Sequence, residues 1–159
     1  MKTAATDSRR RARSPELPGP IYCDASALVK FYVPEAESNA LNRLLEGRRD
    51  LLVSDLSITE IVSSLSRRRR EGTLEATIAS RMHRAILGHV EEGVYRKVEL
   101  ISSTHREAER LLLSLQAVPL RAADALHLAL AVAGDAASLL TFDRRLSDAA
   151  VAIGLGVLA

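Results

Sequence analysis

From residue 21 onward, short apolar runs alternate with segments of helical period, and this alternation constrains the fold more than any other feature. The apolar runs lack the polar alternation of a half-exposed strand, so they predict strands buried on both faces. The expected strands cover residues 21–24, 51–54, 98–101, 138–142 and 155–158. The expected helices cover about residues 26–33, 36–47, 57–70, 73–91, 104–117, 122–133 and 144–153. Buried strands separated by helices predict a parallel five-stranded sheet covered on both faces, an α/β three-layer sandwich.

Charge divides the chain into two expected parts. The formal net charge is +2, but residues 1–20 hold five basic against two acidic side chains (+3) and residues 21–159 hold 17 against 18 (−1). Three prolines and no apolar period predict that residues 1–20 are a disordered basic arm, preceding one domain at 21–159. The arm is interpreted as a dispensable extension or, less favoured, an electrostatic handle for nucleic acid.

No signal-like or membrane-spanning run of about 18 apolar residues is present, so we expect a cytoplasmic protein that does not enter a membrane.

Two rare residue types exclude several kinds of site. The one cysteine, Cys23, excludes an internal disulfide framework and a cysteine-based zinc cluster. Three tyrosines and two phenylalanines are too few for a platform on which RNA bases stack.

Four acidic residues, far apart in sequence, should meet at one edge of this sheet. Asp24 and Asp143 end expected strands, and Glu60 and Asp124 lie in the first turns of helices that start at the carboxyl edge. Clustered carboxylates raise one another's pKa, and a bound divalent cation removes that penalty. Ligands that are all oxygen select Mg²⁺ or Mn²⁺ over zinc, so the pattern predicts a metal site.

Each acid also has a purely structural interpretation. Asp24 and Asp143 are in positions where aspartate commonly forms turns. Glu60 completes the pattern Ser57-x-x-Glu60, a capping box. Asp124 lies in an apolar helix that should be buried, so its carboxylate needs a metal or a partner, and Arg121 and His127 are the local candidates. For His127 itself we expect a structural hydrogen bond in preference to a role as general base.

Four separate blocks of sequence resemble the PIN-domain family, and specifically the VapC-type ribonuclease toxins of prokaryotic toxin–antitoxin pairs. The blocks are IYCDASALV at 21–29, SDLSITEI at 54–61, LRAADALHLA at 120–129 and TFDRRL at 141–146. They occur in the family's order, and the resemblance covers about residues 20–159. One departure is Ala25, where the family usually has a small hydroxyl residue, although Ser26 keeps a hydroxyl next to it.

The resemblance implies a fold, a site and an activity. The sheet order would be 3-2-1-4-5. Asp24, Glu60, Asp124 and Asp143 would form a catalytic, metal-binding quartet, with Asp24 and Asp124 the firmest ligands. Ser26 and Thr141 would orient carboxylates or water. The activity would be Mg²⁺-dependent endonucleolytic hydrolysis of RNA, with Mn²⁺ able to substitute, leaving a 5′-phosphate and a 3′-hydroxyl.

A toxin of this kind implies further partners. The resemblance implies an antitoxin protein and a homodimer, and the apolar surface of the expected helices at 57–91 would suit an amphipathic partner helix. Arginines should offset the acidic site when RNA binds, and Arg121, Arg144 and Arg145 flank the acids in sequence. The run Arg67–Arg70 is interpreted first as a solvated helix end, with room for one or two of its side chains to face a substrate.

Other functions remain to be distinguished. Aspartyl-phosphate phosphatases need a second aspartate where Ser26 stands, and receiver domains need adjacent acids before the first strand's aspartate, so both are disfavoured. A PIN-domain nuclease that processes RNA without being a toxin, and a catalytically inactive PIN-like binding module, remain as alternatives.

Overall fold

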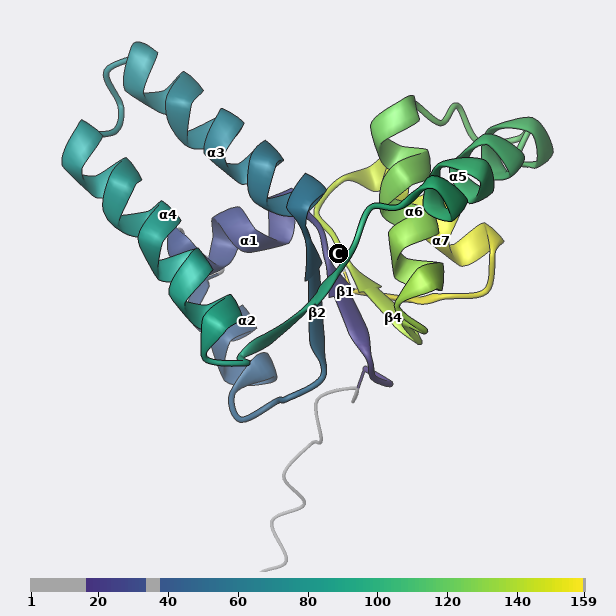
Figure 1. Cartoon of the computed structure of the whole chain (residues 1–159), viewed down its shortest axis with the longest axis horizontal. Coiled ribbons are helices and arrows are strands. Elements are labelled where there is room, and N and C mark those ends of the chain that lie inside the picture. The colour runs from purple at the N-terminus through teal and green to yellow at the C-terminus, as the bar shows by residue number, and fades with distance from the viewer. Residues whose placement is uncertain (1–16, 34–37, 159) are drawn as a thin grey trace, which may run out of the picture.

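A five-stranded parallel sheet is the centre of the computed structural model, which describes residues 17–33 and 38–158 (Figure 1). The strand order is β3-β2-β1-β4-β5, and every neighbouring pair is parallel. The strands are β1 (Ile21–Cys23), β2 (Leu51–Ser54), β3 (Tyr95–Val98), β4 (Ser138–Leu140) and β5 (Gly156–Leu158). The predicted fold class and strand order are therefore confirmed.

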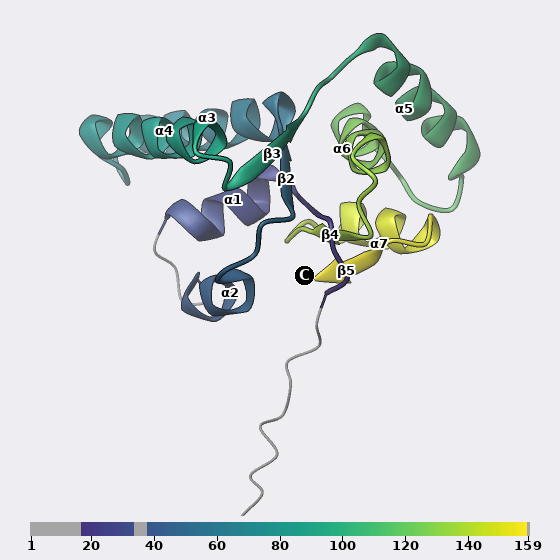
Figure 2. The ribbon, with the colours of Figure 1, turned by 60° about the horizontal axis from the view of Figure 1, so that its bottom comes forward.

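Helices cover both faces of the sheet, which gives three layers (Figure 2). One layer contains α1 (Ala25–Tyr32), α2 (Ser38–Leu45), α3 (Asp55–Arg70) and α4 (Ala76–Glu91). The other layer contains α5 (Ser102–Ser114), α6 (Ala122–Ala133) and α7 (Arg144–Ala152). The predicted helices agree with these within three residues at each end, and residues 36 and 37 of the expected helix at 36–47 lie outside the described residues.

The sheet divides the hydrophobic core in two, and β1 contributes to both halves. Ile21 and Cys23 pack into the core beneath α1–α4, whereas Tyr22 packs into the core beneath α5–α7. Successive side chains of a strand point to opposite faces, which explains this division. All three side chains are fully buried, so the phenolic hydroxyl of Tyr22 must find partners inside the protein.

The third strand lies three residues earlier than predicted. It was expected at 98–101, but β3 is Tyr95–Val98 and pairs in register with Leu51–Ser54. As an edge strand it buries Tyr95 and Val98 and exposes the two charged residues between them, which breaks the apolar run used for prediction. Gly93, with φ of +72°, lies in the turn that leads into the strand.

Three helices begin at the carboxyl edge of the sheet with a side-chain cap. Asp24 caps α1, Ser54 caps α3 and Asp143 caps α7. The Oγ of Ser54 accepts from the backbone N–H of Ser57 at 3.1 Å, so α3 begins two residues before the predicted start. Glu60 therefore lies in the second turn of α3 rather than the first.

The residues just before β1 are held against the domain. Arg48 donates to the backbone oxygen of Leu17, and the hydroxyl of Ser138 donates to that of Pro18. Residues 17–20 of the expected arm thus make ordered contacts, while residues 1–16 and residue 159 lie outside the described residues. Within the described part of the chain, no helix is both long and apolar enough to cross a membrane.

Candidate active site

Asp24 is the most buried acid at the carboxyl edge, with only 4% of the residue exposed. Its Oδ1 accepts from the backbone N–H of Ala27 at 2.9 Å and from Ser26 Oγ at 2.7 Å. Its Oδ2 accepts from Thr141 Oγ1 at 2.6 Å. Burial raises the pKa of Asp24, and these three hydrogen bonds oppose that rise without cancelling it. No lysine or arginine among the described residues forms an ion pair with this carboxylate.

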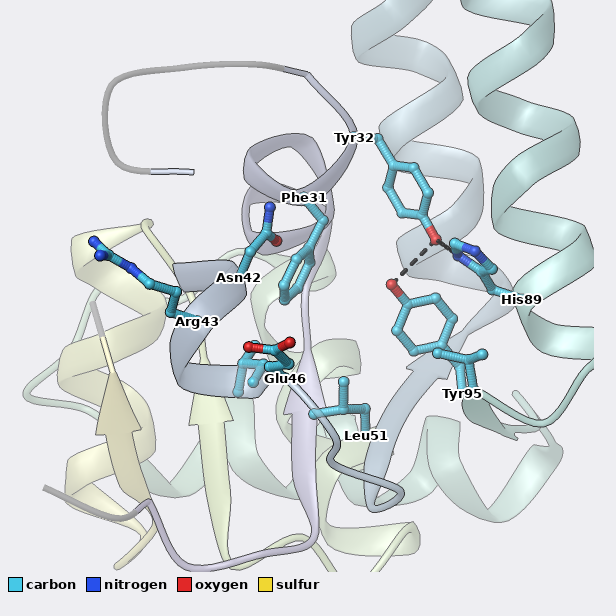
Figure 3. Close-up of a pocket in the computed structure, with 10 residues that line it drawn as sticks. Phe31, Tyr32, Asn42, Arg43, Glu46, Leu51, His89 and Tyr95 are labelled. Atoms are coloured by element: carbon cyan, nitrogen blue, oxygen red, sulfur yellow. Dashed lines mark hydrogen bonds between the residues drawn. The ribbon is translucent and has the colours of Figure 1, made fainter. Parts of the chain in front are cut away.

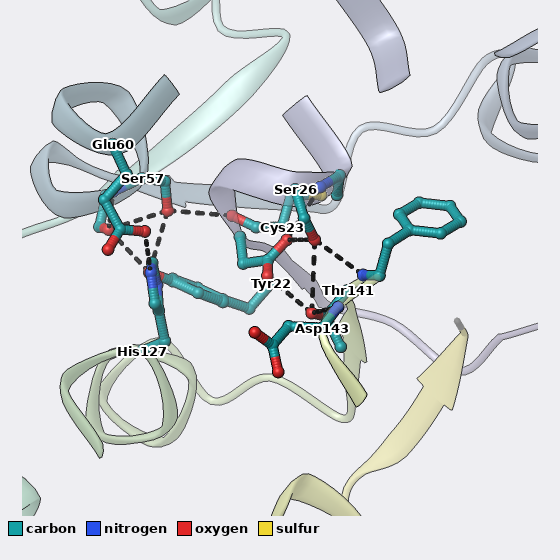
Figure 4. A network of polar contacts seen from close by, with 12 residues as sticks. Tyr22, Cys23, Ser26, Ser57, Glu60, His127, Thr141 and Asp143 are labelled. Carbon is teal, nitrogen blue, oxygen red and sulfur yellow. Dashed lines mark hydrogen bonds and ion pairs between the residues drawn. The ribbon is translucent and has the colours of Figure 1, made fainter. Parts of the chain in front are cut away.

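Ser26 and Thr141 join the two sides of the edge around Asp24 (Figure 4). The Oγ of Ser26 also accepts from the backbone N–H of Phe142 at 2.7 Å. The Oγ1 of Thr141 accepts from the backbone N–H of Asp143 at 3.0 Å. Both hydroxyls therefore connect the start of α1 to the turn between β4 and α7, and both touch the carboxylate that they were predicted to orient.

Asp143 is exposed and acts as the N-cap of α7. Its Oδ1 accepts from the backbone N–H groups of Arg145 at 2.8 Å and Leu146 at 3.1 Å. Among the described residues no hydrogen bond reaches Oδ2. The turn-forming role foreseen for this aspartate is present, and one oxygen remains for another ligand.

Asp124 lies in the first turn of α6, with 13% of its side chain exposed. Its Oδ2 accepts from the backbone N–H of Arg121 at 2.9 Å and lies 3.5 Å from Nη1 of Arg145. The expected local partners are thus corrected. Arg121 contributes its backbone rather than its guanidinium, and the charged partner comes from α7, because His127 turns toward another acid.

That other acid is Glu60, whose Oε2 lies 2.8 Å from Nε2 of His127 (Figure 4). The Nδ1 of the same ring lies 2.9 Å from the hydroxyl of Tyr22. The capping-box interpretation of Glu60 is therefore wrong, because Ser54 is the cap and the glutamate bonds across to α6. The structural hydrogen bond predicted for His127 is present.

Sequence reasoning missed Tyr22, Ser54 and Ser57. The hydroxyl of Tyr22 lies 2.7 Å from Ser54 Oγ and 3.1 Å from Ser57 Oγ. Desolvation raises the pKa of Tyr22 far above its ordinary value, so the hydroxyl is neutral and can donate. A tyrosine inside an apolar strand was the available signal, since a buried phenol needs a polar partner.

The donor chemistry of the edge suits a hard divalent cation, because the four predicted acids and two hydroxyls provide only oxygen. Asp24 is buried and its pKa is raised, and no lysine or arginine among the described residues pairs with it, which is the condition a cation relieves. In the arrangement seen for residues 17–33 and 38–158, however, no three histidine, cysteine, aspartate or glutamate side chains are grouped closely enough to hold a metal ion.

The arginines predicted to bind RNA flank the acids in sequence, and one of them contacts an acid. Arg121 and Arg144 are exposed, and Arg145 keeps 29% of its side chain exposed beside Asp124. A surface pocket of about 280 Å³ is lined by Glu60, Ser63, Ser64, Arg67 and Arg70. Arg69 instead lines a smaller pocket between α3 and α4, together with His83. The arginine run thus divides between two faces of α3.

A pocket of about 460 Å³ lies at the opposite ends of the strands, between α1, α2, α4 and β3 (Figure 3). Leu51 and Tyr95, the first residues of β2 and β3, line it together with aromatic and polar side chains. The hydroxyl of Tyr32 lies 2.6 Å from Nδ1 of His89 and donates to Tyr95 at 3.1 Å. None of the four predicted acids lines this pocket.

A three-layer fold with acids at the carboxyl edge of a parallel sheet matches a known family. The PIN-domain model matches residues 21–152, and the chain belongs to the PIN-domain family. Two relatives from Mycobacterium tuberculosis, ribonuclease VapC46 and ribonuclease VapC35, are each 33% identical to it, over 141 and 148 residues. Each alignment covers 87% of this chain and 96% of the relative.

Solved structures share the fold. M. tuberculosis VapC20, described as a toxin that cleaves the sarcin–ricin loop, superposes with a TM-score of 0.62 at 18% identity, covering 81% of this chain and 94% of VapC20. PAE2754 from Pyrobaculum aerophilum superposes with a TM-score of 0.63 at 22% identity, covering 86% and 82%. At these identities the likeness concerns the fold.

Proposed function

We propose that the chain is a Mg²⁺-dependent endoribonuclease of the VapC type and the toxic component of a toxin–antitoxin pair. Family membership and two relatives that are named ribonucleases support the reaction class. The single observation that carries the site is Asp24, a buried carboxylate held in place by two hydroxyls and a backbone N–H and paired with no lysine or arginine among the described residues. A divalent cation is the partner that such a group lacks.

In this proposal Asp24 and Asp124 hold the cation, with Glu60 and Asp143 beside them. The bound cation would lower the pKa of a water ligand and offset charge on the scissile phosphate. Ser26 and Thr141 keep the carboxylate of Asp24 in one orientation through their hydrogen bonds. Glu60 and Asp143 each have an oxygen without a hydrogen-bond partner among the described residues, so either carboxylate can orient the attacking water. Hydrolysis would leave a 5′-phosphate and a 3′-hydroxyl.

Arginines would bring the phosphate backbone of RNA to this acidic edge. We assign this role to Arg121, Arg144 and Arg145, which lie next to the acids. Arg67 and Arg70 extend the basic surface along α3, because they share a pocket with Glu60. Phosphate contacts would dominate over base stacking, since five aromatic residues are few for a stacking platform.

The proposed partners follow from the family. We propose a cognate antitoxin that binds the apolar surface of α3 and α4 through an amphipathic helix, and a homodimer as the assembled form. The structure describes a small pocket between these helices, lined in part by Val62, Leu65 and Ala79.

Two carboxylate variants and one control test the reaction. D24N and D124N should each lower the rate of RNA cleavage in Mg²⁺ by at least about 100-fold, because each removes a charged ligand. The control is D148N, which makes the same charge change at an exposed position of α7 and should cleave as the wild type does. Circular dichroism would check that all three variants stay folded.

Calorimetric titration with Mn²⁺ gives a second readout that needs no RNA. Wild-type protein and D148N should bind the ion, whereas D24N should not. Cleavage by D24N or D124N at the wild-type rate would show that the assignment is wrong. A wild-type protein that binds neither Mg²⁺ nor Mn²⁺ and does not cleave RNA would instead be the inactive binding module.

A further inference from the structure

We propose that His127, itself held by Tyr22, is the positioning residue for the Glu60 carboxylate. This inference rests on the proposed nuclease function, since it assigns how one acid of that site is held. Tyr22 precedes Asp24 by two residues on β1, His127 follows Asp124 by one helical turn on α6, and Glu60 lies on α3. One hydrogen-bonded chain therefore connects three of the elements that carry the four acids (Figure 4).

The side chains of His127 and Glu60, which this hydrogen bond joins, differ in their freedom to move. The His127 side chain is 4% exposed, whereas the Glu60 side chain on α3 is 37% exposed. A half-exposed glutamate samples several rotamers unless a fixed partner selects one. The buried ring provides that partner at 2.8 Å, and among the described residues it is the only hydrogen bond to the Glu60 carboxylate.

The hydrogen bonds around Tyr22 allow a proton arrangement in which the ring presents an N–H group to Glu60. Ser57 Oγ donates to the backbone oxygen of Cys23 at 3.0 Å, and Ser54 Oγ accepts from the Ser57 backbone N–H. The Tyr22 hydroxyl can then donate to Nδ1 of His127, which leaves the proton of a neutral ring on Nε2, facing Glu60. The other neutral tautomer would set a nitrogen lone pair against the carboxylate.

The same donor faces Glu60 when the ring carries both protons, because Nε2 is then still an N–H group. The positioning role thus does not depend on the charge of His127. Nε2 of His127 bonds to Oε2 of Glu60, and Oε1 of Glu60 has no hydrogen-bond partner among the described residues. Oε1 is the oxygen that would serve the cation or the attacking water.

Amide substitutions at position 127 separate positioning from packing. The side-chain amide N–H of H127Q reaches about as far as Nε2 and can still donate to Glu60. H127N places its amide nearer to Nδ1, so it can bond to Tyr22 but not to Glu60. We expect H127N to lower kcat about 10- to 100-fold with KM within about 3-fold, and to weaken Mn²⁺ binding about 10-fold. H127Q should recover most of both losses.

A double-variant comparison keeps the test valid if stability also changes. If His127 acts through Glu60, adding H127N to E60Q should lower kcat no further than E60Q does alone. Y22F should lower kcat in the same direction as H127N, by a smaller factor. All rates are measured well below the melting temperature of each variant.

The outcomes separate this inference from the function on which it rests. Wild-type kcat and Mn²⁺ affinity in H127N, together with an inactive D24N, would overturn the positioning role and leave the nuclease intact. Equal losses in H127N and H127Q, or multiplicative losses in the E60Q background, would also overturn it by showing a merely structural residue. Absence of both cleavage and Mn²⁺ binding in the wild type would overturn the proposed function and this inference with it.

Discussion

Asp24 shows how one residue combines a structural cost with a chemical use. Its side chain caps α1 and receives two hydroxyl hydrogen bonds, yet burial still raises its pKa above the ordinary value of 3.8. In the absence of a cation the ionised form is therefore destabilising in the folded protein. Such strain is typical of functional carboxylates, which are retained for their chemistry rather than for stability.

The raised pKa of Asp24 predicts a pH-dependent difference between the wild type and D24N. Below pH 3.8 the carboxyl group is protonated in both the folded and unfolded protein and carries no penalty. As the pH rises through the folded-state pKa, the wild type ionises a buried group and loses stability that the neutral asparagine keeps. In EDTA, D24N should melt about 2–8 °C higher than the wild type at pH 7.

Thermal denaturation followed by circular dichroism between pH 4 and pH 7 measures this difference, which should shrink toward pH 4. If D24N melted below the wild type by the same margin at every pH, the hydrogen bonds to the carboxylate would outweigh its burial, and the proposed penalty would be wrong.

At the scale of elements, α3 serves two faces of the molecule. Ile58, Ile61 and Leu65 are buried against the sheet and neighbouring helices. The opposite side carries Glu60 and continues along the helix to Arg67 and Arg70. Positions three or four residues apart share a helical face, so this side runs from the acidic site to a basic end.

Two arginines of α3 should therefore contribute to RNA binding, and a third should not. In the D24N background, in which we expect RNA to bind without being cut, R67Q/R70Q should weaken binding of a labelled single-stranded RNA about 10-fold. The slope of log K against log salt should also fall by about 1.4, or about 0.7 for each lost phosphate contact. R69Q is the matched control, because Arg69 lies on the side of α3 that faces α4.

Fluorescence anisotropy at several salt concentrations provides both numbers. An equal effect of R69Q would show that the arginine run acts only through its overall charge and that the face of α3 beside Glu60 has no special role.

At the scale of the whole molecule, the close approach of the α5–α7 layer to the sheet depends on a glycine. Gly134 ends α6, and a Cβ at this position would lie 2.8 Å from Cδ1 of Leu52 and 2.9 Å from Cγ2 of Val98. Those two side chains belong to the core half that holds Tyr22. The absence of a side chain at Gly134 thus keeps α6, with Asp124 and His127, close to the strands.

G134A should therefore destabilise the protein by about 1–3 kcal/mol through overpacking. Gly88 of α4 is the control, since a Cβ there would meet no atom within 4 Å. G88A should stabilise the protein by about 0.5–1 kcal/mol, because alanine loses less backbone entropy in a helix. Urea denaturation measures both changes, and a neutral G134A would mean that the layers can move apart at little cost.

The sequence alone determined the elements and their general order in space. Apolar periodicity is a local property, so it located α6 at Ala122–Ala133 and β2 at Leu51–Ser54. Ligands of open parallel sheets bind beyond the carboxyl ends of the strands, and this rule predicted that four acids lie at one edge: Asp24, Glu60, Asp124 and Asp143. The PIN-domain resemblance supplied the strand order, which the structure confirms.

Only the tertiary structure decided which side chains meet at that edge. Glu60 bonds to His127, 67 positions away, rather than capping its own helix, and Asp124 faces Arg145 rather than His127. The start of β3 was mispredicted because β3 is an edge strand, where the exposed charged residues Arg96 and Lys97 are tolerated. Each of these contacts joins two elements that are far apart in sequence, so it depends on the rotamers of both side chains and on how closely the elements pack. The local sequence of one element does not specify either. Periodicity therefore predicted that the acids lie at this edge, and tertiary packing determined which side chains they contact.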